Sequence, residues 1–250
     1  MKKLELGTWV QINNSTVVEI IGNSGFDFVV IDLEHSNISL ESLENLLRAT
    51  YQSGLESYVR VNENNPSLIS RVLDLGVDGI VFPNVSSVDE AIKIVKASKF
   101  PPHGNRGSCP CIREAGHWNL NWAEFIKESN KRVKIIALIE GLKGIENFNE
   151  IINVEGIDSY MVGPFDLSVS LGIPGQISHE LISDTYKQFA EIANSNGKEF
   201  IGLDFSYETD DIAVSIKSWK ERNIYKVMTG IDKMFLSKIF SDVANLKNNI

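Results

Sequence analysis

The sequence contains few cysteines and no concentration of positive charge, and each absence excludes a class of protein. Lys and Arg number 24 against 33 Asp and Glu, so the formal net charge of the 250 residues is -9. Nucleic acids and anionic membranes attract proteins through concentrated positive charge, so we expect neither as a partner. The sequence also lacks an apolar segment of membrane-spanning length and a signal-peptide pattern, which predicts a cytoplasmic protein.

The only two cysteines, Cys109 and Cys111, flank Pro110. This spacing suits neither a structural disulfide nor the common zinc and redox motifs. We therefore expect two reduced thiols, as is usual in the cytoplasm.

Residues 26–35, FDFVVIDLEH, show the pattern on which most of the chain is built. The apolar run from Phe28 to Ile31 ends in a segment that contains Asp32, Glu34 and His35. A short apolar run rich in β-branched residues predicts a buried strand of a parallel sheet. In α/β folds, catalytic and binding residues follow the carboxyl ends of such strands.

Similar apolar runs recur along the chain, and helical patterns separate most of them. We expect strands at residues 6–12, 28–33, 57–61, 79–82, 133–139, 157–162, 200–204 and 225–228, and helices at 15–24, 39–53, 66–74, 88–97, 122–130 and 233–246. Ser15 and Ser39 are expected N-caps, and Pro66 suits a helix start. Eight strands that alternate in this way with helices predict an α/β protein with a single (β/α)8 TIM-barrel domain over residues 1–250, although a doubly wound sheet would show a similar alternation.

Residues 100–119 interrupt this alternation with a loop that contains both cysteines. A loop of this length inside a compact domain is usually functional. Arg106 lies close to two glycines and can simply brace the loop. The histidines outside the strand ends have no matched carboxylate, and we expect solvated side chains at His103, His117 and His179.

The residues at the expected strand ends are rich in carboxylates. The carboxyl ends of barrel strands converge on one mouth, which would gather Trp9, Asp32, Glu34, His35, Arg60, Pro83, Glu140, Asp166, Asp204 and Thr229. Glu140 and Asp166 follow neighbouring strands, and two carboxylates with open positions suit a hard divalent ion such as Mg²⁺ or Mn²⁺. A single acid at a strand end is more often a helix cap or an ion-pair partner. The pair therefore indicates a metal site where either residue alone would not.

Each of the other candidates has a structural alternative. His35 can be a hydrogen-bonded surface imidazole, Arg60 an ion-pair partner and Asp74 an ordinary helix charge. Lys226 lies inside the eighth strand without a neighbour that would activate it as a nucleophile. We expect it to be a surface or rim residue rather than the lysine of a Schiff-base aldolase.

Six motifs cover nearly the whole chain in a fixed order. They are DLEH at 32–35, VR at 59–60, LDLG at 73–76, PPHGNRG at 101–107, IE at 139–140 and GPFDLSVSLG at 163–172. In this order they resemble the HpcH/HpaI aldolases, metal-dependent class II pyruvate aldolases with a phosphoenolpyruvate/pyruvate-type barrel. The resemblance implies reversible cleavage of a 2-keto-4-hydroxy acid to pyruvate and an aldehyde through a metal-bound pyruvate enolate. It also implies a homo-oligomer, often a hexamer, in which the last helix, 233–246, is exchanged between subunits.

The same resemblance implies a role for each site residue. Glu140 and Asp166 are the expected ligands of Mg²⁺ or Mn²⁺, with Co²⁺ as a further candidate. The remaining roles are enolate stabilisation by Arg60, acid–base catalysis by His35 oriented by Asp74, a pocket wall at Trp9, and pyruvate binding at the turn that holds Phe165 and Asp166. A cation beside the developing enolate oxygen stabilises it increasingly as charge forms there.

Three residues depart from the family pattern and leave the aldehyde partner open. Leu138 stands where Gln is common, Val61 where Pro is frequent, and Phe165 where Ala is usual. Three other functions remain as alternatives. They are an acyl-CoA lyase of the citrate-lyase-like branch, a catalytically idle barrel used as a binding or assembly module, and a phosphosugar isomerase. The last would need a glycine-rich phosphate site that the final two strand ends lack.

Overall fold

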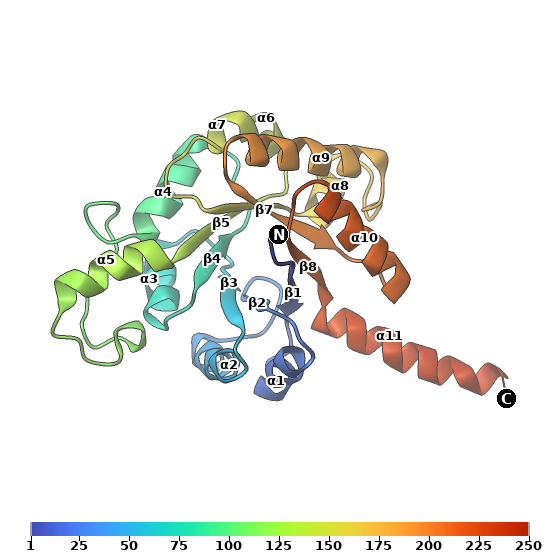
Figure 1. The fold of residues 1–250 in the computed structure, drawn as a ribbon, viewed down its shortest axis with the longest axis horizontal. Helices are drawn as coiled ribbons and strands as arrows, with labels where there is room; N and C mark the ends of the chain where they lie inside the picture. Colours follow the sequence, from blue (N-terminus) through green and yellow to red (C-terminus); the bar gives the residue numbers. More distant parts are fainter. Residues whose placement is uncertain (1, 250) are drawn as a thin grey trace. The chain divides into compact units, whose positions relative to one another are not determined.

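The computed structural model describes residues 2–249, and its eight strands form a closed barrel in the order of the chain (Figure 1). The prediction of a (β/α)8 barrel is confirmed. Two compact units make up the chain: one consists of the residues up to Ser57 and from Gly202 onward, and the other of Tyr58–Ile201. Among the described residues, no helix is both long and apolar enough to cross a membrane.

The first unit is organised around β1, which pairs in parallel with β2 on one side and β8 on the other. Gly7 permits this packing, because a Cβ there would lie only 2.2 Å from the ring of Phe28. The unit contains β1 Glu5–Val10, β2 Phe28–Asp32, β8 Lys226–Ile231, α1 Ser15–Asn23, α2 Leu40–Gln52, α10 Thr209–Glu221, α11 Asp232–Asn245 and the 3-10 turn Leu246–Asn249.

The second unit contains a run of parallel strands in which β4 pairs with β3 and β5, and β5 pairs with β6. Most of these strand residues are apolar and buried, as expected for a parallel sheet that is covered on both faces. The strands that lie wholly in this unit are β4 Gly79–Phe82, β5 Lys134–Ile139 and β6 Ser159–Val162, whereas β3 Glu56–Arg60 and β7 Glu199–Asp204 each span a boundary between the units. Its helices are α3 Pro66–Asp74, α4 Val88–Ser98, α5 Trp122–Arg132, α6 Leu142–Glu146, α7 Phe148–Ile151, α8 Pro164–Ser170 and α9 Glu180–Ser195, with a 3-10 turn at Arg113–Ala115.

Two helix caps were predicted, and one of them is wrong. Ser39 caps α2 as expected, because its hydroxyl accepts from the N–H of Ser42. At α1 the cap is Asn14, whose side chain accepts from the N–H of Thr16, and Ser15 is already helical. The expectation of a solvated His179 is also wrong, because its Nδ1 accepts from the N–H of Leu181 and caps α9.

Lys226 is buried, which corrects the expectation of a surface or rim residue. Its ammonium group lies 2.6 Å from a carboxylate oxygen of Glu56 and 3.3 Å from one of Glu5, and it sits over the ring of Phe28. Burial is possible because the two carboxylates compensate the charge. Lys226 begins β8 and so lies at the amino end of that strand, away from the end that carries the candidate site.

The long loop is fixed by Arg106, whose side chain is fully buried. Its Nη2 donates to Asp74 Oδ1 at 2.7 Å and to Glu114 Oε2 at 2.6 Å, and its guanidinium lies 4.4 Å from the ring centre of Phe100. The prediction that Arg106 braces the loop is confirmed. The side chain of Glu114 is also almost fully buried, at 2% exposure, so it depends on nearby cations.

Replacing Arg106 is therefore expected to destabilise the fold strongly. Arg106→Met keeps much of the apolar packing but deprives a buried carboxylate of a cation, which typically costs about 3–5 kcal/mol. Arg48→Met is the matched control, because Arg48 pairs with Glu44 on the exposed face of α2 and such pairs contribute about 1 kcal/mol or less. Urea unfolding followed by circular dichroism measures both, and equal losses would contradict the assignment.

Candidate functional site

The carboxylate of Glu140 is held at the carboxyl end of β5 by its surroundings. Glu140 is 3% exposed, and its Oε1 accepts from the N–H of Asn84 at 2.8 Å. Asn84 follows β4 and has a left-handed backbone, with φ 54, which Asn adopts more readily than most residues. On the other side, a Cβ at Gly163 would lie 2.6 Å from Glu140 Oε2. The carboxylate therefore occupies the space that the missing side chain of Gly163 leaves.

Asp166 enters the same region from the next strand. Ile139 and Val162 are paired in β5 and β6, and Gly163 then serves as the N-cap of α8 without a side-chain hydrogen bond. Asp166 lies in the first turn of this helix and is exposed. Of the two acids, one is thus buried and oriented and the other is open to solvent.

Two carboxylates suit a divalent ion whose remaining coordination positions are filled by water and substrate oxygens. In the described part of the chain, no group of three or more His, Cys, Asp or Glu side chains is arranged to hold a metal. A closed structural site of the zinc type is therefore not formed by these residues. The Glu140 carboxylate has room beside Gly163 because glycine has no Cβ. This fixed position supports Glu140 as an oriented metal ligand.

Gly163→Ala is expected to displace the Glu140 carboxylate and weaken metal binding. A contact of 2.6 Å is far shorter than real Cβ contacts, so the carboxylate or the turn must move. Loss of orientation around a metal ligand commonly costs about 10–100-fold in affinity. Isothermal titration with Mn²⁺ measures the effect. Gly141→Ala is the control, because a Cβ there would meet only Ser170 Oγ, at 4.0 Å, and unchanged affinity in both variants would contradict the prediction.

Arg60 and Leu138 complete the described strand ends of the second unit. Arg60 ends β3, is 8% exposed and pairs across the sheet with Val81. Leu138 is 1% exposed and stands two residues before Glu140, so the two share one side of β5. An apolar side chain therefore precedes Glu140 on that side of the strand. Phe165, in contrast, is half exposed at the start of α8.

In the first unit, Asp32 organises the turn that carries His35. The carboxylate of Asp32 is fully buried and accepts from Gln11 Nε2 at 2.8 Å and from the N–H groups of Glu34 and His35 at 3.0 and 3.3 Å. The hydroxyl of Ser36 donates to the carbonyl oxygen of Asp32. This bonding fixes the backbone and leaves the imidazole of His35 59% exposed, with Nε2 3.9 Å from Glu34 Oε2.

Trp9 lies in β1 within the same unit and is 5% exposed. Its neighbours across the sheet are Val30 of β2 and Ile231 of β8. Two residues further on, the N–H groups of Gln11 and Ile12 donate to Asp232 Oδ2. The ends of β1, β2 and β8 are therefore joined by side-chain hydrogen bonds as well as by the sheet.

Asp74 does not lie with the other candidates of the second unit. Arg60 ends β3, and α3 then returns along the strands over nine residues, or about 13 Å, to end at Asp74. Asp74 is consequently at the amino end of β4, where it binds Arg106. The role of Asp74 as the residue that orients His35 stays a prediction, and the structure gives Asp74 a bracing role in its own unit.

Three residues that shape the site were not found by sequence reasoning. Asn84, Gln11 and Gly163 act on Glu140 or Asp32 through contacts between elements far apart in the chain. For Gly163 a signal was present, because a Gly-Pro pair directly after a strand marks a turn into a helix. Nothing in the sequence near Asn84 or Gln11 indicates these contacts.

Two curated relatives are aldolases. The chain is 29% identical over 235 residues to a 2-keto-3-deoxy-L-rhamnonate aldolase of Escherichia coli O17:K52:H18, with 94% of this chain and 85% of the relative covered. It is 32% identical over 197 residues to a 5-keto-4-deoxy-D-glucarate aldolase of Escherichia coli O157:H7, with 79% of this chain and 76% of the relative covered.

Two solved structures share the fold closely. An HpcH/HpaI aldolase from Desulfitobacterium hafniense DCB-2 has a TM-score of 0.91 at 27% identity, and the citrate synthase SbnG has a TM-score of 0.87 at 30% identity. Each comparison covers 99% of this chain and 94% of the other. The family model described as HpcH/HpaI aldolase/citrate lyase matches residues 5–216. Since that match spans most of the chain, the protein belongs to the HpcH/HpaI aldolase/citrate lyase family.

Proposed function

We propose that the protein is a divalent-metal-dependent class II aldolase that reversibly cleaves a 2-keto-4-hydroxy acid to pyruvate and an aldehyde. Its family and its aldolase relatives make it a carbon–carbon lyase that acts on a small molecule. The observation that carries the proposal is the buried carboxylate of Glu140, which lies in the space beside Gly163, the N-cap of the helix whose first turn contains Asp166. Burial of a carboxylate is costly unless it is paired or coordinates a metal, so a bound cation would stabilise Glu140 in this position.

In this proposal Glu140 and Asp166 hold the ion, with Mg²⁺ and Mn²⁺ as the metals that two carboxylates suit best and Co²⁺ as a further candidate. The bound ion supplies positive charge that stabilises the enolate of pyruvate. Arg60 binds the same developing oxygen through its guanidinium. The turn at Phe165 and Asp166 binds the pyruvate carboxylate through backbone N–H groups, to which Pro164 cannot contribute.

His35 is the proposed acid–base residue at the C4 hydroxyl group, which loses its proton when the carbon–carbon bond breaks. The turn bonded to Asp32 fixes the backbone of His35 and leaves its imidazole open to a substrate. Glu34, 3.9 Å from Nε2, is a carboxylate in the same unit that can orient the ring. Trp9 is the proposed wall of the pocket.

For the aldehyde partner we propose a polyhydroxylated aldehyde derived from a sugar acid. Both curated relatives carry the names of deoxy sugar-acid aldolases. Leu138 lacks the polar contact that the Gln common at this position would make, and Phe165 is bulkier than the usual Ala and crowds the pocket beside the metal. We therefore expect a shorter or less oxidised aldehyde to be accepted as well.

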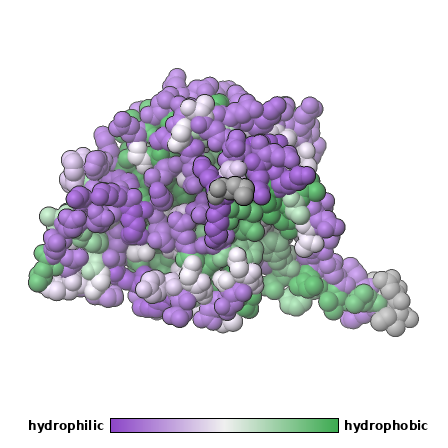
Figure 2. Space-filling model, in the orientation of Figure 1, coloured by the Kyte–Doolittle hydropathy of each residue, from purple (hydrophilic) through white to green (hydrophobic). Residues whose placement is uncertain are grey.

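We further propose that the chain is a single barrel domain that forms a homo-oligomer, a hexamer by family resemblance, through exchange of α11. This helix extends away from β1 and β8, and hydrophobic residues are visible along it (Figures 1 and 2). Its exposed apolar side chains are Leu236, Ile239, Phe240 and Val243. Light scattering at several protein concentrations tests the proposal, and a monomer at all of them would contradict it.

The proposed function is tested by deuterium exchange into the methyl group of pyruvate in D₂O, followed by proton NMR. Exchange that needs Mn²⁺ and stops with a chelator is expected, because it reports enolate formation without any aldehyde. A screen of hydroxyaldehydes for aldol products then follows. Absence of exchange under both conditions would overturn the aldolase assignment.

A second function is citrate formation, favoured by the likeness to the citrate synthase SbnG. The same NMR experiment separates the two functions when oxaloacetate and acetyl-CoA replace pyruvate. Citrate formed without pyruvate exchange would favour this alternative.

A further inference from the structure

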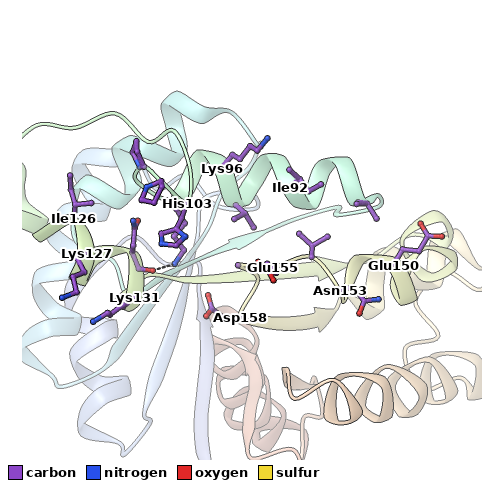
Figure 3. Close-up of a pocket in the computed structure, with 18 of the residues that line it drawn as sticks. Ile92, Lys96, His103, Ile126, Lys127, Lys131, Glu150, Asn153, Glu155 and Asp158 are labelled. Atoms are coloured by element: carbon purple, nitrogen blue, oxygen red, sulfur yellow. Dashed lines mark hydrogen bonds between the residues drawn. The ribbon is translucent and has the colours of Figure 1, made fainter. Parts of the chain in front are cut away.

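A groove on the outer side of the second unit lies apart from the strand ends described above. It runs between α4 and α5 and is closed at one side by residues 150–158, which connect α7 to β6 (Figure 3). Its volume is about 1070 Å³. That is at the upper end of the range of small-molecule sites, so an organic molecule has room to bind.

The groove is lined by apolar side chains and by a group of basic residues. Its apolar lining consists of Val88, Ile92, Val95, Pro101, Pro102, Ala123, Ile126 and Val154. Lys96, Lys99, Lys127, Lys131 and His103 come from α4, α5 and the segment between them. Figure 3 shows Lys127, Lys131 and His103 on one side of the groove and Glu150 and Asn153 on the other.

Lys99 is the unusual member of this basic group because it is only 7% exposed. Its Nζ donates to the carbonyl oxygens of Asn130 at 2.8 Å and Val133 at 2.6 Å. A lysine ammonium group has three donors, so one remains beyond these two partners. Among the described residues, no carboxylate lies within ion-pair distance of the Lys99 ammonium group. Its hydrogen-bond acceptors are the two backbone carbonyl oxygens.

The surroundings of Lys99 favour an anion. Burial lowers the pKa of Lys99, the positive charges of Lys134, Arg132 and Arg106 act in the same direction, and only Asp158 opposes them. An anion bound at the ammonium group would offset both effects, because it pairs with the charge that burial disfavours. Burial of a lysine without a carboxylate partner is rare in structures.

We propose that this groove is a second ligand site, for an organic molecule that has an apolar body and a single carboxylate, which binds Lys99. The apolar lining takes the body of the ligand. Glu150, Glu155 and Asp158 line the rest of the groove and repel a second negative charge at the far end. A ligand with a single anionic group therefore fits better than a dicarboxylate.

The test is isothermal titration with two probes that share an apolar body, 2-naphthoate and the neutral 2-naphthylmethanol. The native protein is expected to bind the acid about tenfold or more tightly than the alcohol, as one charged hydrogen bond allows. Lys99→Met should remove that difference, whereas Lys93→Met, on the exposed outer face of α4, should keep it. Inorganic phosphate added to the cell should weaken naphthoate binding in the native protein.

A further variant covers the case in which Lys99→Met fails to fold. Ala123 is exposed and lines the groove, so Ala123→Trp fills the site without disturbing the core. It is expected to abolish binding of both probes. Absence of naphthoate binding to the native protein, equal affinity for the two probes, or unchanged binding in Ala123→Trp would each overturn the proposal.

Discussion

Asp166→Ala is expected to lose metal binding and aldol activity together. Asp166 is exposed in the first turn of α8, three residues after the glycine that leaves room for Glu140, and its removal leaves one of the two proposed carboxylate ligands. A metal that stabilises a developing negative charge contributes several kcal/mol, so kcat/KM should fall about a thousandfold. Titration with Mn²⁺ and a coupled assay for released pyruvate measure the two losses.

Asp89→Ala provides a matched control for this variant. Asp89 is also an exposed acid in the first turn of a helix, α4, of the same unit. It should retain full metal affinity and activity, which separates metal ligation from the loss of a helix-terminal charge. If Asp166→Ala binds Mn²⁺ as tightly as the parent, the assignment of Asp166 as a ligand is wrong.

The elements with strong local signals were predicted well. Helix α3 and strand β4 have the predicted bounds, Pro66–Asp74 and Gly79–Phe82. At α3 the signal is a proline in the first turn, preceded by Asn65, whose side chain caps the helix. Such signals depend on residues adjacent in the chain, so a single sequence is enough to find them.

Features that depend on distant contacts could not be predicted in the same way. Lys226 was expected at the surface, but Glu5 and Glu56 of the neighbouring elements neutralise it inside. Neither acid is near Lys226 in the chain, and a lysine is rarely buried without such partners. The error therefore came from missing tertiary information and not from the strand pattern, which was correct.

The candidate site shows the same division. Glu140 and Asp166 were predicted as candidates because each follows an apolar run, and the carboxyl ends of parallel strands lie on one edge of the sheet. The space beside Gly163 and the hydrogen bond from Asn84 were not, because they fix how the Glu140 carboxylate is oriented and not where it lies in the sequence. The sequence thus predicts the residues of the candidate site, and the structure shows what orients Glu140.

His35→Asn is expected to keep metal binding and lose aldol turnover. In the structure His35 belongs to the turn after β2, where the Asp32 carboxylate fixes its backbone, and it is not one of the two proposed metal ligands. General acid–base catalysis typically contributes about 10²–10⁴-fold, and kcat should fall by that factor. Retro-aldol cleavage, monitored by pyruvate release, measures it alongside a Mn²⁺ titration.

The control for this variant is His117→Asn. His117 is exposed in the long loop and has a left-handed backbone, φ 68, which Asn tolerates. Its activity and metal affinity should equal those of the parent. Full turnover in His35→Asn would show that the imidazole takes no part in the reaction. Weakened Mn²⁺ binding would instead indicate that His35 is a metal ligand. Either result would require a different proton acceptor for the C4 hydroxyl, and Glu34 is then the nearest ionisable group on the same turn.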